Sequence, residues 1–84
     1  MTEQLICSDH ARCRMAQRGI SLADIGYVVT HGFDVENGRD EAVVLRRTDI
    51  PPEDQRSFGH LAGTKVVLHG GLVKTTYRNR SRWS

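Results

Sequence analysis

The chain has 84 residues and a formal net charge of +2, and 38% of its residues are hydrophobic. We expect a single domain over residues 1–84, with a thin folded core over residues 5–78 and a polar basic tail over residues 79–84. No apolar run approaches the roughly 20 residues that a membrane helix needs, and no signal segment is recognisable. We therefore expect a cytoplasmic protein without a membrane segment.

Charge is distributed unevenly along the chain. Residues 1–42 carry four basic and seven acidic side chains, whereas residues 43–84 carry eight basic and three acidic ones. A basic excess of this kind is typical of a surface that faces a polyanion, although a solubilising tail has the same composition. The candidate nucleic-acid-binding residues are Lys74, Arg78, Arg80 and Arg82.

Helix-capping residues near the N-terminus predict a first helix from about Asp9 to Arg18. Either Ser8 or Asp9 can cap its start, because a side-chain oxygen there accepts hydrogen bonds from free backbone N–H groups. Gly19 can take the left-handed conformation that ends a helix. One side of this helix carries polar residues at helical spacing: His10, Arg14 and either Gln17 or Arg18. This side is either an ordinary solvated face or a site for phosphate chemistry.

A second helix is expected from about Leu22 to Thr30, directly after the first. Ser21 and Asp24 have the spacing of a capping box at its start, and Gly32 follows its end. Together the two helices form a helical hairpin or corner. The residues expected to face the core are Cys7, Ala11 and Met15 around the first helix, and Leu22, Ile25, Val28 and Val29 in the second.

After residue 32 the apolar residues alternate with a period of two, which predicts strands. The expected strands cover residues 33–35, 41–48, 64–69 and 72–78, with tight turns at Asn37-Gly38 and Gly70-Gly71. The segment 49–63 has weak periodicity and is expected to be a functional or a variable loop. We therefore predict an α+β domain in which two N-terminal helices pack on a three- to four-stranded antiparallel sheet. The other face of the sheet is open.

Two cysteines, Cys7 and Cys13, flank His10 near the start of the first helix. Three such residues do not complete a tetrahedral zinc site, and no second pair follows. We expect both thiols to be reduced and half-buried. The chain also has no glycine-rich phosphate loop and no metal-hydrolase or serine-hydrolase motif. We therefore expect no metal and no cofactor.

The chain contains the pattern His10-Ala11-x-x-Arg14-Met15-x-x-Arg18-Gly19-Ile20-Ser21, and near its end Val73-x-Thr75-x-Tyr77. This combination resembles a family of small bacterial proteins known as the domain of unknown function 4258, over about residues 6–78. The resemblance implies a distant likeness to the RelE-like and barnase-like ribonuclease fold, some members of which are toxins of toxin–antitoxin systems. It implies that His10, Arg14 and Arg18 match the helix motif, and that Thr75 and Tyr77 match the strand motif.

These side chains suit chemistry on a phosphodiester. Metal-free cleavage of RNA needs a base, an acid and cations around the phosphate. A histidine such as His10 exchanges protons near neutral pH, and Arg14, one turn further, can hold a phosphate through two hydrogen bonds. We therefore keep two hypotheses, with the oligomeric state open. One is a non-catalytic module that binds RNA or an antitoxin-like protein. The other is a metal-free, RelE-like endoribonuclease with His10, Arg14, Arg18 and Tyr77 as candidate catalytic residues.

Overall fold

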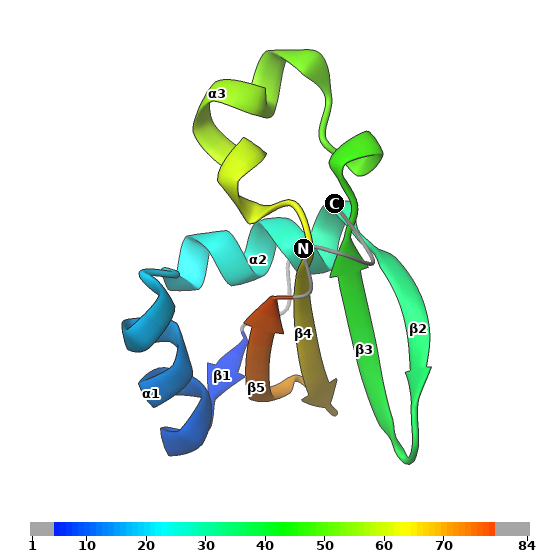
Figure 1. Cartoon of the computed structure of the whole chain (residues 1–84). Coiled ribbons are helices and arrows are strands. Elements are labelled where there is room, and N and C mark those ends of the chain that lie inside the picture. Colours follow the sequence, from blue (N-terminus) through cyan, green and yellow to red (C-terminus); the bar gives the residue numbers. More distant parts are fainter. Residues whose placement is uncertain (1–4, 79–84) are drawn as a thin grey trace.

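The computed structural model describes residues 5–78, which form a five-stranded sheet with helices against one face and one edge (Figure 1). The strands are β1 (Ile6–Cys7), β2 (Phe33–Asn37), β3 (Asp40–Leu45), β4 (Thr64–His69) and β5 (Leu72–Arg78). The helices are α1 (Asp9–Arg18), α2 (Leu22–His31) and α3 (Gln55–Phe58), and short 3₁₀ turns cover Arg47–Asp49, Pro52–Asp54 and Gly59–Leu61. The strand order is β1-β5-β4-β3-β2.

The α+β class is confirmed, but the expected three- to four-stranded antiparallel sheet is wrong in detail. The sheet has five strands and is mixed, because β1 pairs in parallel with β5 while the other neighbours are antiparallel. In this pairing Ile6 lies opposite Leu72, and Cys7 lies opposite Val73. A two-residue strand has no detectable period, and its partner lies at the other end of the described chain.

Both N-terminal helices begin and end as their capping residues predict. The Ser8 hydroxyl accepts a hydrogen bond of 3.1 Å from the Ala11 backbone N–H, and Gly19 ends α1 with a φ of 66°. At the start of α2, Ser21 and Asp24 form the reciprocal capping box, with bonds of 3.1 and 3.0 Å. These local bonds explain why α1 and α2 could be located from the sequence.

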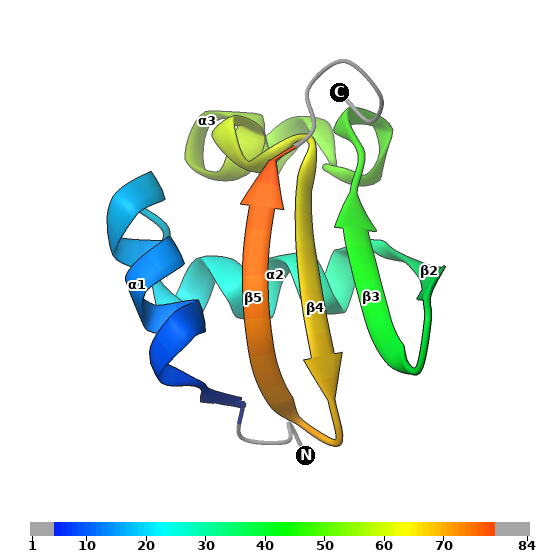
Figure 2. The ribbon, with the colours of Figure 1, turned by 60° about the horizontal axis from the view of Figure 1, so that its bottom comes forward.

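The core lies between α2 and the sheet, and α1 packs beside β5 (Figures 1 and 2). Ile25 and Val28 are fully buried as expected, and Tyr27 is buried with them. Leu22 was expected in the core but is 52% exposed, because the first turn of α2 faces a surface hollow shared with Arg12 and Met15. No helix among the described residues is long and apolar enough to cross a membrane.

The connection from α2 to β2 is tight at Gly32. A Cβ atom at this position would lie 2.6 Å from both Val43 Cγ1 and the Val44 carbonyl oxygen. A side chain therefore does not fit where the chain leaves α2 and joins the sheet beside β3. Gly32 accordingly serves close packing, since its φ of −75° is open to any residue.

The β2–β3 hairpin differs slightly from its predicted bounds. Its two turn residues are Gly38 and Arg39, and Asn37 still pairs with Asp40, so the turn is one residue later than expected. The strand β3 ends at Leu45 rather than at residue 48. The Asp49 carboxylate accepts hydrogen bonds from the backbone and side chain of Arg46, which bends the chain out of the sheet. These bonds from Arg46 also lower the pKa of Asp49.

The segment 49–63, expected to be a functional or a variable loop, folds into short helical turns that cover one end of the core. Ile50 and Leu61 are buried, and Phe58 stacks on Tyr27 with ring centroids 3.9 Å apart. His31 stacks on Tyr27 as well, at 4.0 Å. The His31 and Phe58 rings must lie on opposite faces of the Tyr27 ring, because both stack on it this closely. Tyr27 is therefore held between His31 of α2 and Phe58 of α3.

The Tyr27 hydroxyl donates a hydrogen bond of 2.8 Å to Asp54 in the same helical segment. Burial and this bond to a carboxylate raise the pKa of Tyr27 to about 12. The segment is thus fixed to α2 by ring stacking and by a hydrogen bond, and it is part of the packed domain.

Candidate nucleic-acid interface

The face of the sheet opposite α2, called here the outer face, is not covered by any helix of residues 5–78 (Figure 2). Its centre contains small apolar residues, Ala42, Val44 and Val67, which are nevertheless buried. Larger side chains surround this centre. The Arg46 guanidinium lies 4.0 Å from the centre of the Phe33 ring, and the Lys65 ammonium lies 5.4 Å from that of the Tyr77 ring.

Lys65 lies on the outer face near the start of β4, the central strand of the sheet. In register it lies between Val44 of β3 and Tyr77 of β5. Its ammonium donates a hydrogen bond of 3.1 Å to the side-chain oxygen of Asn37 on β2. Tyr77, a candidate catalytic residue, therefore packs across strands against a cation. The contact between Lys65 and Asn37 was not predicted from the sequence, although the alternation along β4 places Lys65 on the face opposite the core residue Val66.

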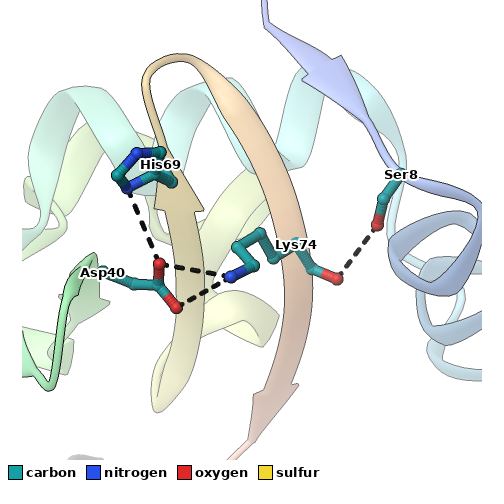
Figure 3. A network of polar contacts seen from close by, with 4 residues as sticks. All are labelled: Ser8, Asp40, His69 and Lys74. Atoms are coloured by element: carbon teal, nitrogen blue, oxygen red, sulfur yellow. Dashed lines mark hydrogen bonds and ion pairs between the residues drawn. The ribbon is translucent and has the colours of Figure 1, made fainter.

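A second polar group lies nearer the turn ends of the strands (Figure 3). The Lys74 ammonium reaches over β4 to both Asp40 oxygens, at 3.1 and 3.3 Å, and the ring of His69 lies 3.7 Å from the same carboxylate. Lys74 is the extra residue where the β4–β5 register shifts, since Leu68 pairs with Val73. Lys74 was a candidate nucleic-acid-binding residue, but its charge is already offset by Asp40.

The exposed side of α1 is basic. His10, Arg14 and Arg18 are all exposed there, and Arg12 is exposed on another side of the helix. Arg14 lies 3.5 Å from the Gln17 side-chain oxygen, a weak contact. Within residues 5–78, none of the three arginines forms an ion pair. These cations are therefore available to a ligand.

The candidate residues come together only in part. Packing places α1 beside β5, as the two views in Figures 1 and 2 show, so His10 and Arg14 share one edge of the domain with that strand. No hydrogen bond or ion pair in the described part of the chain connects either residue to Tyr77. Arg78 donates a hydrogen bond to the His60 carbonyl. Arg80 and Arg82 lie outside the described residues.

Acidic residues gather at the opposite edge of the sheet. Asp34 and Glu36 are exposed on β2, and Glu36 lies directly opposite Glu41 of β3. The strand β2 forms one edge of the sheet, and α1 packs beside β5 and β1 at the other edge. The described domain is therefore basic on one side and acidic on the other. A field of this form orients an approaching polyanion toward α1.

The two thiols are free and differ in exposure. Cys7 is half-buried against the core, as expected, whereas Cys13 is exposed because it lies on the side of α1 that faces away from Ala11. Among residues 5–78, no three His, Cys, Asp or Glu side chains are grouped so that they could hold a metal ion.

Residues 5–78 thus form a small α+β domain with a sheet face that none of their helices covers and a basic helix at one edge. The chain matches the family model described as "Domain of unknown function (DUF4258)" over residues 7–78, and it belongs to this family. No curated protein and no solved structure matches the chain.

Proposed function

We propose that this domain binds single-stranded RNA, without cleaving it, through the exposed basic side of α1 and the outer face beside it. The observation that carries the proposal is the set of exposed cations on α1. A ten-residue helix with three exposed arginines and one histidine has a single acidic residue, Asp9. Arginine binds phosphate through two parallel hydrogen bonds, and such contacts supply most of the affinity for a nucleic acid.

The outer face favours single-stranded RNA over a duplex. Phe33 and Tyr77 are half-buried aromatic residues on this face, and each lies beside a cation. Unpaired bases stack on aromatic side chains, whereas the bases of a duplex already stack on each other. A basic helix next to a sheet with aromatic residues therefore combines phosphate contacts with base stacking.

Binding of a fluorescent, mixed-sequence single-stranded RNA, measured by anisotropy at several salt concentrations, tests the proposal. Replacing Arg14 by methionine keeps the apolar stem and removes the charge. We expect weaker binding and a logarithmic salt slope smaller by about 0.7 for each phosphate that the variant no longer neutralises. The control is Arg56→Met, which removes an exposed arginine of α3. No binding by the wild type at low salt, or equally weakened binding in both variants, would refute the proposal.

The competing function is a metal-free endoribonuclease, and one observation favours it. His10 is exposed one helical turn before Arg14, so an acid–base group and a phosphate-binding group lie on one side of α1. Incubation of the protein with an RNA pool in EDTA separates the two functions. Cleavage that persists in EDTA and is lost in His10→Ala would replace the binding proposal by the enzymatic one.

A further inference from the structure

Lys65 differs from the other cations of the outer face in its partners. Lys74 contacts the Asp40 carboxylate, and Arg46 contacts the Asp49 carboxylate at 2.9 Å. Lys65 instead contacts a neutral amide oxygen and an aromatic ring, and within residues 5–78 no carboxylate forms an ion pair with it.

The ammonium of Lys65 is also partly removed from water. Lys65 is half-buried, and it lies next to the buried side chains of Val44 and Val67. A cation in such a position loses hydration, and a neutral hydrogen-bond partner restores only part of the lost energy. The position therefore favours an anion as an additional partner.

Side chains from distant strands converge on this ammonium. Asn37 lies on β2 and Tyr77 on β5, and β3 and β4 separate these strands in the sheet. Lys65 lies on β4 between them, next to Tyr77 in register, and its long side chain reaches across β3 to Asn37. Because Asn37 accepts from Lys65 through its oxygen, its NH₂ group remains as a donor. Tyr77 also has a hydroxyl donor, and the centre of its ring lies 5.4 Å from the Lys65 ammonium.

From this geometry we infer that Lys65, Asn37 and Tyr77 form a binding site for one phosphate group on the outer face. The ligand class is a phosphate ester, and its source is the RNA backbone, an assignment that rests on the proposed function. One cation and two neutral donors match the charge and the acceptor oxygens of a phosphodiester.

A nuclear magnetic resonance titration tests the site directly. The signals to follow are the Asn37 side-chain amide and the Tyr77 ring, and the probes are inorganic phosphate and a short single-stranded RNA. We expect saturable shifts of both signals in the wild type. In Lys65→Met, which keeps the apolar stem, the shifts should disappear, and Lys65→Arg should restore them. Arg56→Met should leave them unchanged.

The two probes distinguish the sources of the phosphate. Shifts with RNA support a backbone phosphate, and shifts with inorganic phosphate alone support the site while rejecting RNA as its ligand. In the anisotropy assay, Lys65→Met should weaken RNA binding several-fold and lower the salt slope by about 0.7, the value for one phosphate. No saturable shift with either probe, or unchanged shifts in a folded Lys65→Met sample, would overturn the inference. Failure of Arg14→Met to weaken RNA binding would instead count against the proposed function alone.

Discussion

The Ser8 hydroxyl donates a hydrogen bond of 3.1 Å to the Lys74 carbonyl, and thereby attaches the start of α1 to β5. The same oxygen accepts the hydrogen bond from the Ala11 N–H that caps the helix. The neighbouring Ser8 backbone N–H donates to the Val73 carbonyl at 2.9 Å. The position of the basic helix relative to the sheet thus depends on a residue that also starts the helix.

Replacing Ser8 by alanine should lower the free energy of unfolding by about 1–2 kcal/mol, because the variant has neither the cap nor the side-chain bond to β5. Chemical denaturation measured by circular dichroism reports this change. Ser57→Ala, an exposed serine in α3, is the matched control and should change stability by less than about 0.5 kcal/mol. Equal stability of the two variants would show that the Ser8 contacts contribute little.

Two glycines next to α2 should respond oppositely to alanine. Gly32→Ala places a methyl group 2.6 Å from Val43 and from the Val44 carbonyl, so we expect the free energy of unfolding to fall by about 2 kcal/mol or more. Gly26 lies inside α2, where an added Cβ meets nothing within 4 Å. Gly26→Ala should therefore raise the free energy of unfolding by about 0.5–1 kcal/mol through helix propensity. Thermal unfolding of both variants checks the pair, and destabilisation of similar size in both would contradict it.

Two buried threonines of the sheet differ in hydrogen bonding. Thr76 donates to the Lys65 carbonyl at 3.0 Å, whereas the Thr64 hydroxyl is buried without a hydrogen-bond partner among the described residues. Valine has nearly the same shape as threonine. Thr64→Val should therefore leave stability unchanged or raise it by about 1 kcal/mol, and Thr76→Val should lower it by a similar amount. Denaturant titrations measure both effects, and destabilisation by Thr64→Val would indicate a partner for its hydroxyl.

The phenol of Tyr27 should titrate unusually late. The chain has two tyrosines, so Tyr77→Phe leaves Tyr27 as the only phenol. In the folded protein its pKa is raised from 10.0 to about 12, mainly by burial and then by Asp54. An unfolded chain loses this proton near pH 10. The protonated phenol of Tyr27 therefore contributes its full amount to the free energy of unfolding below about pH 10, and this contribution falls as the pH approaches about 12.

Ultraviolet absorbance of the phenolate in Tyr77→Phe follows this ionisation directly. Half-ionisation near pH 10 in a folded sample would contradict the buried environment. Tyr27→Phe should remove the decline of stability between about pH 10 and 12 that is due to this group.

The helices and central strands could be predicted because their signals are local. The caps at Ser8, Gly19 and Ser21 define α1 and α2, and alternation marks β4 and β5. The strand β1 could not be predicted, since two residues contain no period and their pairing with β5 is non-local. The helical turns within residues 49–63 were missed because their order comes from packing on Tyr27, which local propensity does not report.

The candidate site was predictable to a similar degree. Helical spacing correctly placed His10, Arg14 and Arg18 on one exposed side of α1. The cluster around Lys65 was not predictable, because Lys65 of β4 contacts Asn37 of β2 across β3, a contact that exists only in the folded sheet. Nor could the sequence reveal that Asp40 offsets the charge of Lys74, which depends on the register of the sheet.

The pairing of β1 with β5 also has a consequence for protein synthesis. A ribosome makes α1 first, yet the strand on which α1 packs is among the last described segments to leave the exit tunnel. Until residues 72–78 emerge, Ser8 lacks its partner carbonyl and the arginine-bearing helix has no support. A nascent chain thus remains unable to assemble this surface until β5 has emerged, and any truncation before residue 72 removes the support permanently.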